Sequence, residues 1–124
     1  MKNTEFKKIT EKAKKDKDII AIALFGSSLK GKGRDIDICL FMNKKYSNLH
    51  MSKKRLKFLK SLNSKFDIQI FQQLPVYIRI KILKEGKILY CKKEKLLYDI
   101  AFSTIKEFSG FKEIYESYIK NALK

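Results

Sequence analysis

The apolar run Ile19–Phe25 (IIAIALF) limits the possible folds more than any other segment of this chain. It is only seven residues long, whereas a helix needs roughly 20 apolar residues to cross a bilayer. Its isoleucines are β-branched, and a glycine follows the run directly. These features predict a buried strand that is covered on both faces, and they argue against a membrane span at this point.

Four other parts of the chain carry apolar residues at helical spacing and are predicted to be helices: residues 4–16, 48–64, 75–86 and 95–124. Pro75 suits the first turn of its helix, because no backbone N–H is required there, and Gly86 marks the end of that helix. Ser109 and Gly110 predict a break that divides the last segment into two helices.

Three further segments are predicted to be strands: residues 35–41 (DIDICLF), 66–71 (FDIQIF) and 87–91. Helices and strands in this order predict an α+β fold, a small mixed sheet backed by helices. The length of 124 residues suits a single domain. We expect a core at about residues 18–91, with C-terminal helices appended at about residues 95–124.

Gly26 and Ser27 stand where the buried strand ends, a position that suits phosphate binding. Glycine has no Cβ, so backbone N–H groups can approach an anion closely. A short helix beginning after the turn would add partial positive charge, and the serine hydroxyl would donate one more hydrogen bond. The alternative for Gly26-Ser27-Ser28 is an ordinary turn.

Asp35 and Asp37 are two residues apart on a predicted strand, so their carboxylates are expected to point the same way. Aspartate is a poor strand former, and two like charges at such close range repel each other. A divalent cation removes the repulsion, and Mg²⁺ takes carboxylate oxygens together with substrate phosphates. The alternative is a strand entrance at which Asp35 ends a loop and Asp37 faces solvent.

Asp67 opens a third apolar strand 30 residues after Asp37 and beyond one helix. This separation is enough for a crossover or for a long antiparallel return. If this strand lies beside the one that holds Asp35 and Asp37, three carboxylates meet at one end of the sheet. Three acids can hold two metal ions and deprotonate a hydroxyl, as nucleotidyl transfer requires. The alternative for Asp67 alone is a cap or a charge at a strand start.

The segments FGSSLKGKGRDIDICLF and FDIQIF together resemble the nucleotidyltransferase superfamily related to DNA polymerase beta, and more closely its minimal nucleotidyltransferases. The pattern of that family is a Gly-Ser pair, an Asp-x-Asp on the next strand and a third Asp on a later strand. The resemblance implies that the triphosphate of ATP is bound at Gly26, Ser27 and Ser28. It implies that catalysis and the binding of two Mg²⁺ ions fall to Asp35, Asp37 and Asp67.

Minimal nucleotidyltransferases often act with a small HEPN-domain protein as a toxin–antitoxin pair. In such pairs the nucleotidyltransferase is the antitoxin and transfers AMP from ATP to a tyrosine of the HEPN ribonuclease. The resemblance therefore implies a protein adenylyltransferase with a HEPN-domain partner. The residues leave another function open, a non-catalytic basic module on the same fold that neutralises a partner by contact or binds RNA. A transferase for RNA ends or antibiotics would usually carry an extra substrate domain.

The net charge of +16 raises the question of a polyanionic partner. Of the 29 basic residues, only Arg34, Arg55 and Arg79 are arginine, the residue that reads bases and phosphates by two-point contacts. A surface made basic by lysine is therefore expected to be mainly solvated, and nucleic acid is not the favoured partner. Attraction of a triphosphate, an RNA or an acidic protein remains the alternative.

Cys39 and Cys91 have no metal-ligand spacing, and on predicted strands we expect both to be small buried side chains. The N-terminus shows no secretory pattern, so a cytoplasmic location is the expectation. Late aromatic residues are expected mainly to fill the core, and any surplus would form an interface with a partner or a second copy. They are Tyr77, Tyr90, Tyr98, Phe102, Phe108, Phe111, Tyr115 and Tyr118.

Overall fold

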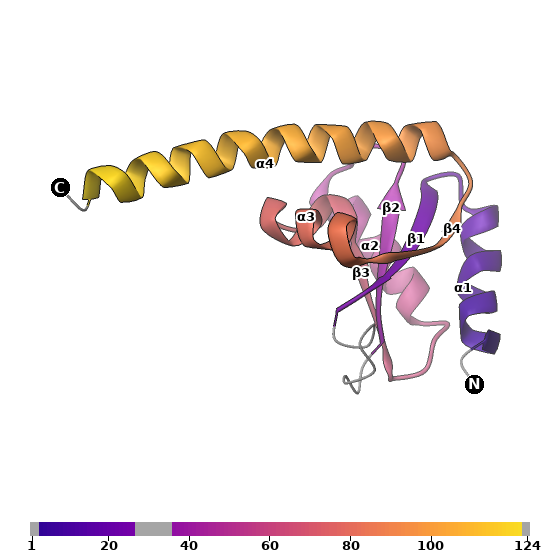
Figure 1. The fold of residues 1–124 in the computed structure, drawn as a ribbon. Helices are drawn as coiled ribbons and strands as arrows, with labels where there is room; N and C mark the ends of the chain where they lie inside the picture. The colour runs from indigo at the N-terminus through magenta and orange to yellow at the C-terminus, as the bar shows by residue number, and fades with distance from the viewer. Residues whose placement is uncertain (1–2, 27–35, 123–124) are drawn as a thin grey trace.

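The computed structural model describes residues 3–26 and 36–122, and these form one mixed sheet with helices on both sides (Figure 1). The strands are β1 (Ile19–Phe25), β2 (Ile36–Met42), β3 (Phe66–Ile70) and β4 (Lys87–Cys91). The helices are α1 (Asn3–Lys15), α2 (Asn48–Leu59), α3 (Val76–Glu85) and α4 (Glu94–Ala122), with a 3₁₀ turn, η2, at Phe71–Gln73. The predicted α+β fold with a mixed sheet is confirmed.

The strand order in the sheet is β3-β2-β1-β4. β1 pairs antiparallel with β2 and β4, whereas β2 and β3 are parallel. A parallel pair needs a crossover connection, and α2 supplies it between β2 and β3. The sequence left a crossover and an antiparallel return open for Asp67, and the structure has the crossover.

Each face of the sheet carries its own apolar cluster, so β1 is covered on both faces as predicted. Ile19 and Ile22 belong to the cluster beneath α1 and α2, together with Phe58. Ala21 and Ala23 belong to the cluster on the opposite face, against α3 and the first turns of α4. Every residue of β1 from Ile19 to Ala23 is buried, so apolar side chains are favoured at each of these positions.

The C-terminal segment is one helix of 29 residues, so the predicted break at Ser109 and Gly110 is wrong. A glycine inside a helix costs about 1 kcal/mol relative to alanine, which is too little to interrupt a long helix on its own. The first part of α4 packs against α3 and the sheet. The rest projects beyond the sheet, and every described residue from Ser109 to Ala122 is exposed (Figure 1).

Most of the late aromatic residues do not fill the core, which corrects that prediction. The exposed ones are Tyr77, Tyr98, Phe102, Phe111, Tyr115 and Tyr118. Phe111, Tyr115 and Tyr118 are exposed because α4 extends beyond the sheet. Tyr77 on α3 and Tyr98 and Phe102 at the start of α4 are exposed although their helices pack on the sheet. Cys39 is buried as predicted, and burial raises the pKa of its thiol, whereas Cys91 is only half-buried. None of the described helices is long and apolar enough to cross a membrane.

Candidate active site

Gly26 follows the last residue of β1 and lies directly beside the carboxylate of Asp37. Phe25 is the pairing partner of Asp37 across β1 and β2, so the chain leaves the sheet next to this aspartate. Gly26 has a φ of +79°, a conformation that side chains disfavour, and a Cβ placed on it would lie 2.3 Å from Asp37 Oδ2. Only glycine therefore fits at this position while the aspartate keeps its place.

Asp37 and Asp67 lie directly opposite each other on the parallel strands β2 and β3. Neighbouring strands are about 4.8 Å apart, and side chains in register leave the sheet on the same face. The backbone N–H of Ile36 also donates to the carbonyl of Lys65, at 2.7 Å, which ties the starts of the two strands together. Two of the predicted carboxylates thus meet at one end of the sheet, next to Gly26.

Two side chains outside the predicted site residues, Arg55 and Gln69, hold Asp67 in place. Arg55 donates from Nη2 to Asp67 Oδ1 at 3.1 Å, and Gln69 donates from Nε2 to Oδ2 at 3.0 Å. The Nε of Arg55 also donates to the backbone carbonyl of Ile68. Because β3 is an edge strand, Arg55 reaches it from α2 and binds both its backbone and its aspartate.

The neighbouring residue Lys54 fixes α2 at the other end of the sheet. Its Nζ lies 2.9 Å from Asp16 Oδ2 and 3.1 Å from Asp18 Oδ2, in the turn before β1. Burial by itself would lower the pKa of Lys54, but the hydrogen bonds to the two aspartates outweigh burial and raise it. His50, which also lies on α2, is exposed and forms a hydrogen bond with Asp18. This network sets the position from which Arg55 approaches Asp67.

The other predicted site residues, Ser27, Ser28 and Asp35, lie outside the described residues, as does the predicted short helix after the turn. Within residues 3–26 and 36–122, no three histidine, cysteine, aspartate or glutamate side chains form a metal-binding group. The described part of the site therefore consists of Gly26, Asp37 and Asp67, with Arg55 and Gln69 behind Asp67.

Comparison with protein families gives a match to the polymerase beta nucleotidyltransferase domain over residues 7–95. That range holds the whole sheet and all six predicted site residues. The chain belongs to the polymerase beta-like nucleotidyltransferase family. The match confirms the resemblance that was inferred from the Gly-Ser and Asp-x-Asp segments of this nucleotidyltransferase.

A relative from Methanocaldococcus jannaschii, named "Putative protein adenylyltransferase", is 36% identical over 75 residues. The match covers 58% of this chain and 56% of the relative, so the chain spans little more than half the length of that protein.

Solved structures share the fold over the full length of the nucleotidyltransferase. A chain in the complex of a tri-AMPylated Shewanella oneidensis HEPN toxin with MNT antitoxin superimposes with a TM-score of 0.72 and 19% identity, covering 100% of both chains. A chain of a toxin–antitoxin structure with AMP-PNP gives 0.72 and 18% identity, again covering 100% of both chains. The likeness includes α4, so the long C-terminal helix is part of the shared architecture.

Proposed function

We propose that this nucleotidyltransferase transfers AMP from ATP to a tyrosine hydroxyl of a HEPN-domain protein and so acts as its antitoxin. The observation that carries the proposal is the pairing of Asp37 with Asp67 beside the Cβ-free turn at Gly26. This arrangement combines acidic oxygens with a close backbone approach for phosphate. The toxin–antitoxin complexes with an AMPylated toxin and with AMP-PNP share the fold and support the same chemistry.

The residues fit a magnesium-dependent reaction. Carboxylate oxygens are the ligands that Mg²⁺ prefers, and Asp37 Oδ2 lies so close to the backbone of Gly26 that a Cβ there would collide with it. A metal ion held by this carboxylate would therefore lie beside the turn that we assign to the phosphates. In the proposal, Asp35, Asp37 and Asp67 hold two Mg²⁺ ions, while Gly26, Ser27 and Ser28 bind the triphosphate. When bound, the metal neutralises charge on the phosphates.

The proposed transfer forms one bond and breaks one. The acceptor oxygen attacks the α-phosphorus of ATP, the bond to the β-phosphate oxygen breaks, and pyrophosphate leaves. The proton of the acceptor hydroxyl passes to the carboxylate of Asp67. Arg55 and Gln69 each bind one oxygen of that carboxylate and hold its orientation. Positioning of this kind is a large part of how phosphoryl-transfer sites accelerate reaction.

The projecting half of α4 is the surface that we assign to the partner. Its exposed apolar side chains recur at helical spacing, at Phe111, Ile114, Tyr115 and Tyr118. Exposure of such an apolar stripe to water is unfavourable for a monomer, and a helical protein can cover it. A HEPN partner is favoured over a second copy because the matched complexes pair this fold, including its last helix, with a HEPN toxin.

The test is transfer of label from α-³²P-ATP to a HEPN-domain protein from the same genome, in the presence of Mg²⁺. The wild-type chain should label the protein, and Asp37→Asn should reduce the rate by at least about 100-fold. The matched control is Asp99→Asn, an exposed aspartate on α4 that should keep the wild-type rate. Equal labelling by Asp37→Asn would remove Asp37 from the mechanism, and no labelling by the wild type would reject transfer.

A further inference from the structure

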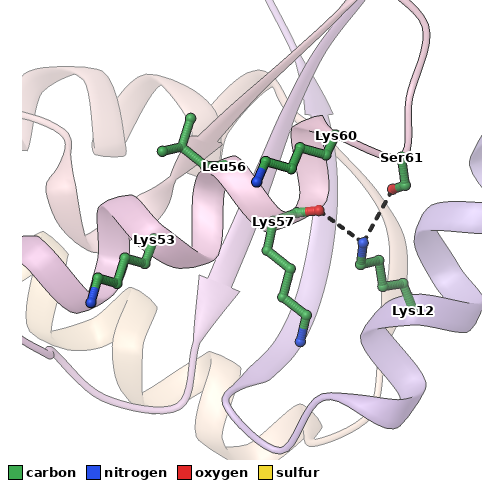
Figure 2. A pocket seen from close by; sticks show the side chains of 6 residues that line it. All are labelled: Lys12, Lys53, Leu56, Lys57, Lys60 and Ser61. Carbon is green, nitrogen blue, oxygen red and sulfur yellow. Dashed lines mark hydrogen bonds between the residues drawn. The ribbon is translucent and has the colours of Figure 1, made fainter.

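A groove between α1 and α2 carries lysines along both of its sides. Two adjoining hollows share Lys12 and Ser61 and together follow the two helices. Figure 2 shows Lys53, Lys57 and Lys60 projecting from α2, with Lys12 reaching the same helix from α1. We call this feature the lysine groove and define it by six of its lysines, Lys8, Lys12, Lys15, Lys53, Lys57 and Lys60; Lys7 also lines it.

The lysines of the groove repeat with the same spacing on both helices. On α1 they stand at positions 8, 12 and 15; on α2 they stand at positions 53 and 57, and at position 60 in the C-cap. Residues separated by four and then three positions share one face of a helix. With a rise of about 1.5 Å per residue, each row extends for about 10 Å. The groove therefore presents two rows of positive charge rather than a single cluster.

Few acidic groups neutralise these rows. Lys8 lies 3.3 Å from Glu5, and Lys57 lies 3.7 Å from Asp16, which is already bound by Lys54. No described acidic side chain forms an ion pair with Lys15, Lys53 or Lys60. Glu11 also lines the groove, but it pairs with Lys14 at 3.2 Å rather than with a lysine of the two rows. The groove thus keeps most of its positive charge for a ligand.

Lys12 is half-buried between α1 and α2. Its Nζ donates to two neutral acceptors, the Lys57 carbonyl at 2.8 Å and the Ser61 hydroxyl at 3.3 Å, which joins α1 to α2. Burial and the charge of Lys57 lower the pKa of Lys12, against a weaker opposite effect of Asp16. An anion in the groove would relieve the repulsion between these amines.

We propose that the lysine groove binds the phosphodiester backbone of a nucleic acid strand. Two rows of point charges match a ligand whose negative charges repeat, and lysine binds phosphate without reading bases. No aromatic residue lines the groove within the part of the chain that the structure describes, so stacking of bases is not expected there. Among the described residues Leu56 is the one large apolar side chain in its lining, which is too little for the core of an interface with an acidic protein.

The groove lies away from the carboxylate pair, so it can be tested without the transfer reaction. α1 and α2 cover one face of the sheet, whereas Asp37 and Asp67 alternate with the isoleucines packed on that face. Binding to the groove needs neither ATP nor a protein partner. The outcome of a binding experiment therefore does not depend on whether the proposed adenylyl transfer takes place.

The experiment measures binding of fluorescent 20-nucleotide single-stranded RNA and DNA by anisotropy at several salt concentrations. The test variant is Lys53→Gln/Lys57→Gln/Lys60→Gln, which removes the α2 row. It leaves the hydrogen bonds from Lys12 to the Lys57 carbonyl and the Ser61 hydroxyl in place. The matched control is Lys81→Gln/Lys112→Gln/Lys120→Gln, which removes the same charge from exposed sites on α3 and α4. Circular dichroism checks that each variant is folded, and Lys8→Gln/Lys15→Gln tests the α1 row independently.

Each phosphate contact on a single strand contributes about 0.7 to the slope of log K against log salt. The α2 variant should therefore flatten the slope by about 2, and the control should leave it within about 0.5. Binding of RNA and DNA alike, or of RNA more tightly, supports the proposal. Equal loss in the test and control variants, no binding by the wild type, or equally tight binding of polyglutamate overturns it.

Discussion

Replacing Arg55 by methionine should impair the site through Asp67 rather than through the fold. The change removes the hydrogen bond from Nη2 to Asp67 Oδ1 at 3.1 Å and the one from Nε to the Ile68 carbonyl. The side chains of Arg55 and Asp67 are 33% and 39% exposed, so solvent screens their ion pair. We expect a loss of about 1–2 kcal/mol in the free energy of unfolding, mostly from the backbone contact.

The effect on adenylyl transfer should be larger than the effect on stability. A carboxylate displaced by about 1 Å can cost about 100-fold in rate, because transfer depends on position. We therefore expect kcat to fall about 10- to 100-fold for Arg55→Met, with little change in the KM for ATP. Arg55→Lys keeps the charge without the two-point contact, so it should recover only part of the rate.

Arg79 on α3 offers a matched control, because its hydrogen bonds go to Leu74 and Glu107 rather than to Asp67. It too donates from Nε to a backbone carbonyl, that of Leu74 at 2.9 Å, and it binds the carboxylate of Glu107 with Nη1 at 3.1 Å and Nη2 at 2.7 Å. Arg79→Met should therefore cost a similar amount of stability, measured by urea unfolding, while kcat stays at the wild-type value. Wild-type kcat in Arg55→Met, or an equal loss in both variants, would refute a positioning role for Arg55.

Three further predictions follow from single contacts. Gly26→Ala places a Cβ 2.3 Å from Asp37 Oδ2, so thermal unfolding should show a loss of about 1–2 kcal/mol and calorimetry weaker ATP binding. Gly110→Ala meets nothing within 4 Å and should raise the free energy of unfolding by about 0.5–1 kcal/mol; destabilisation would contradict an unbroken α4. A hydrogen bond from Arg79 lowers the pKa of Glu107, so its stabilisation is present above the unfolded pKa of about 4.3 and lost as pH falls through the folded value. Urea unfolding of wild type and Glu107→Gln should differ at pH 6 and converge near pH 3.

The sequence predicted the sheet and the carboxylates because both depend on local patterns. Alternating apolar residues set the face on which Asp37 and Asp67 stand, and the length of the intervening helix permits the crossover. The role of Arg55 was not predictable in this way. It depends on β3 lying at the edge of the sheet and on the anchoring of α2, neither of which leaves a mark near Arg55 in the sequence.

The C-terminal helix was mispredicted for a different physical reason. Ser109 and Gly110 weaken a helix, but neither imposes a stop, because glycine lowers helix stability only modestly. The aromatic residues beyond them were assigned to a core that the sheet is too small to provide. Helical spacing tells which side chains share a face, but it does not tell whether that face meets the same chain or a partner.

The most direct test of the adenylyl-transfer proposal is the mass of the HEPN-domain protein after incubation with ATP, Mg²⁺ and this nucleotidyltransferase. We expect a gain of one or more adenylyl groups on tyrosine with the wild-type chain. We expect no gain over the same period with Asp67→Asn, provided that circular dichroism shows the variant to be folded. An equal gain with Asp67→Asn, or an unchanged mass with the wild-type chain, would contradict the assignment of the Asp37–Asp67 pair as the catalytic centre.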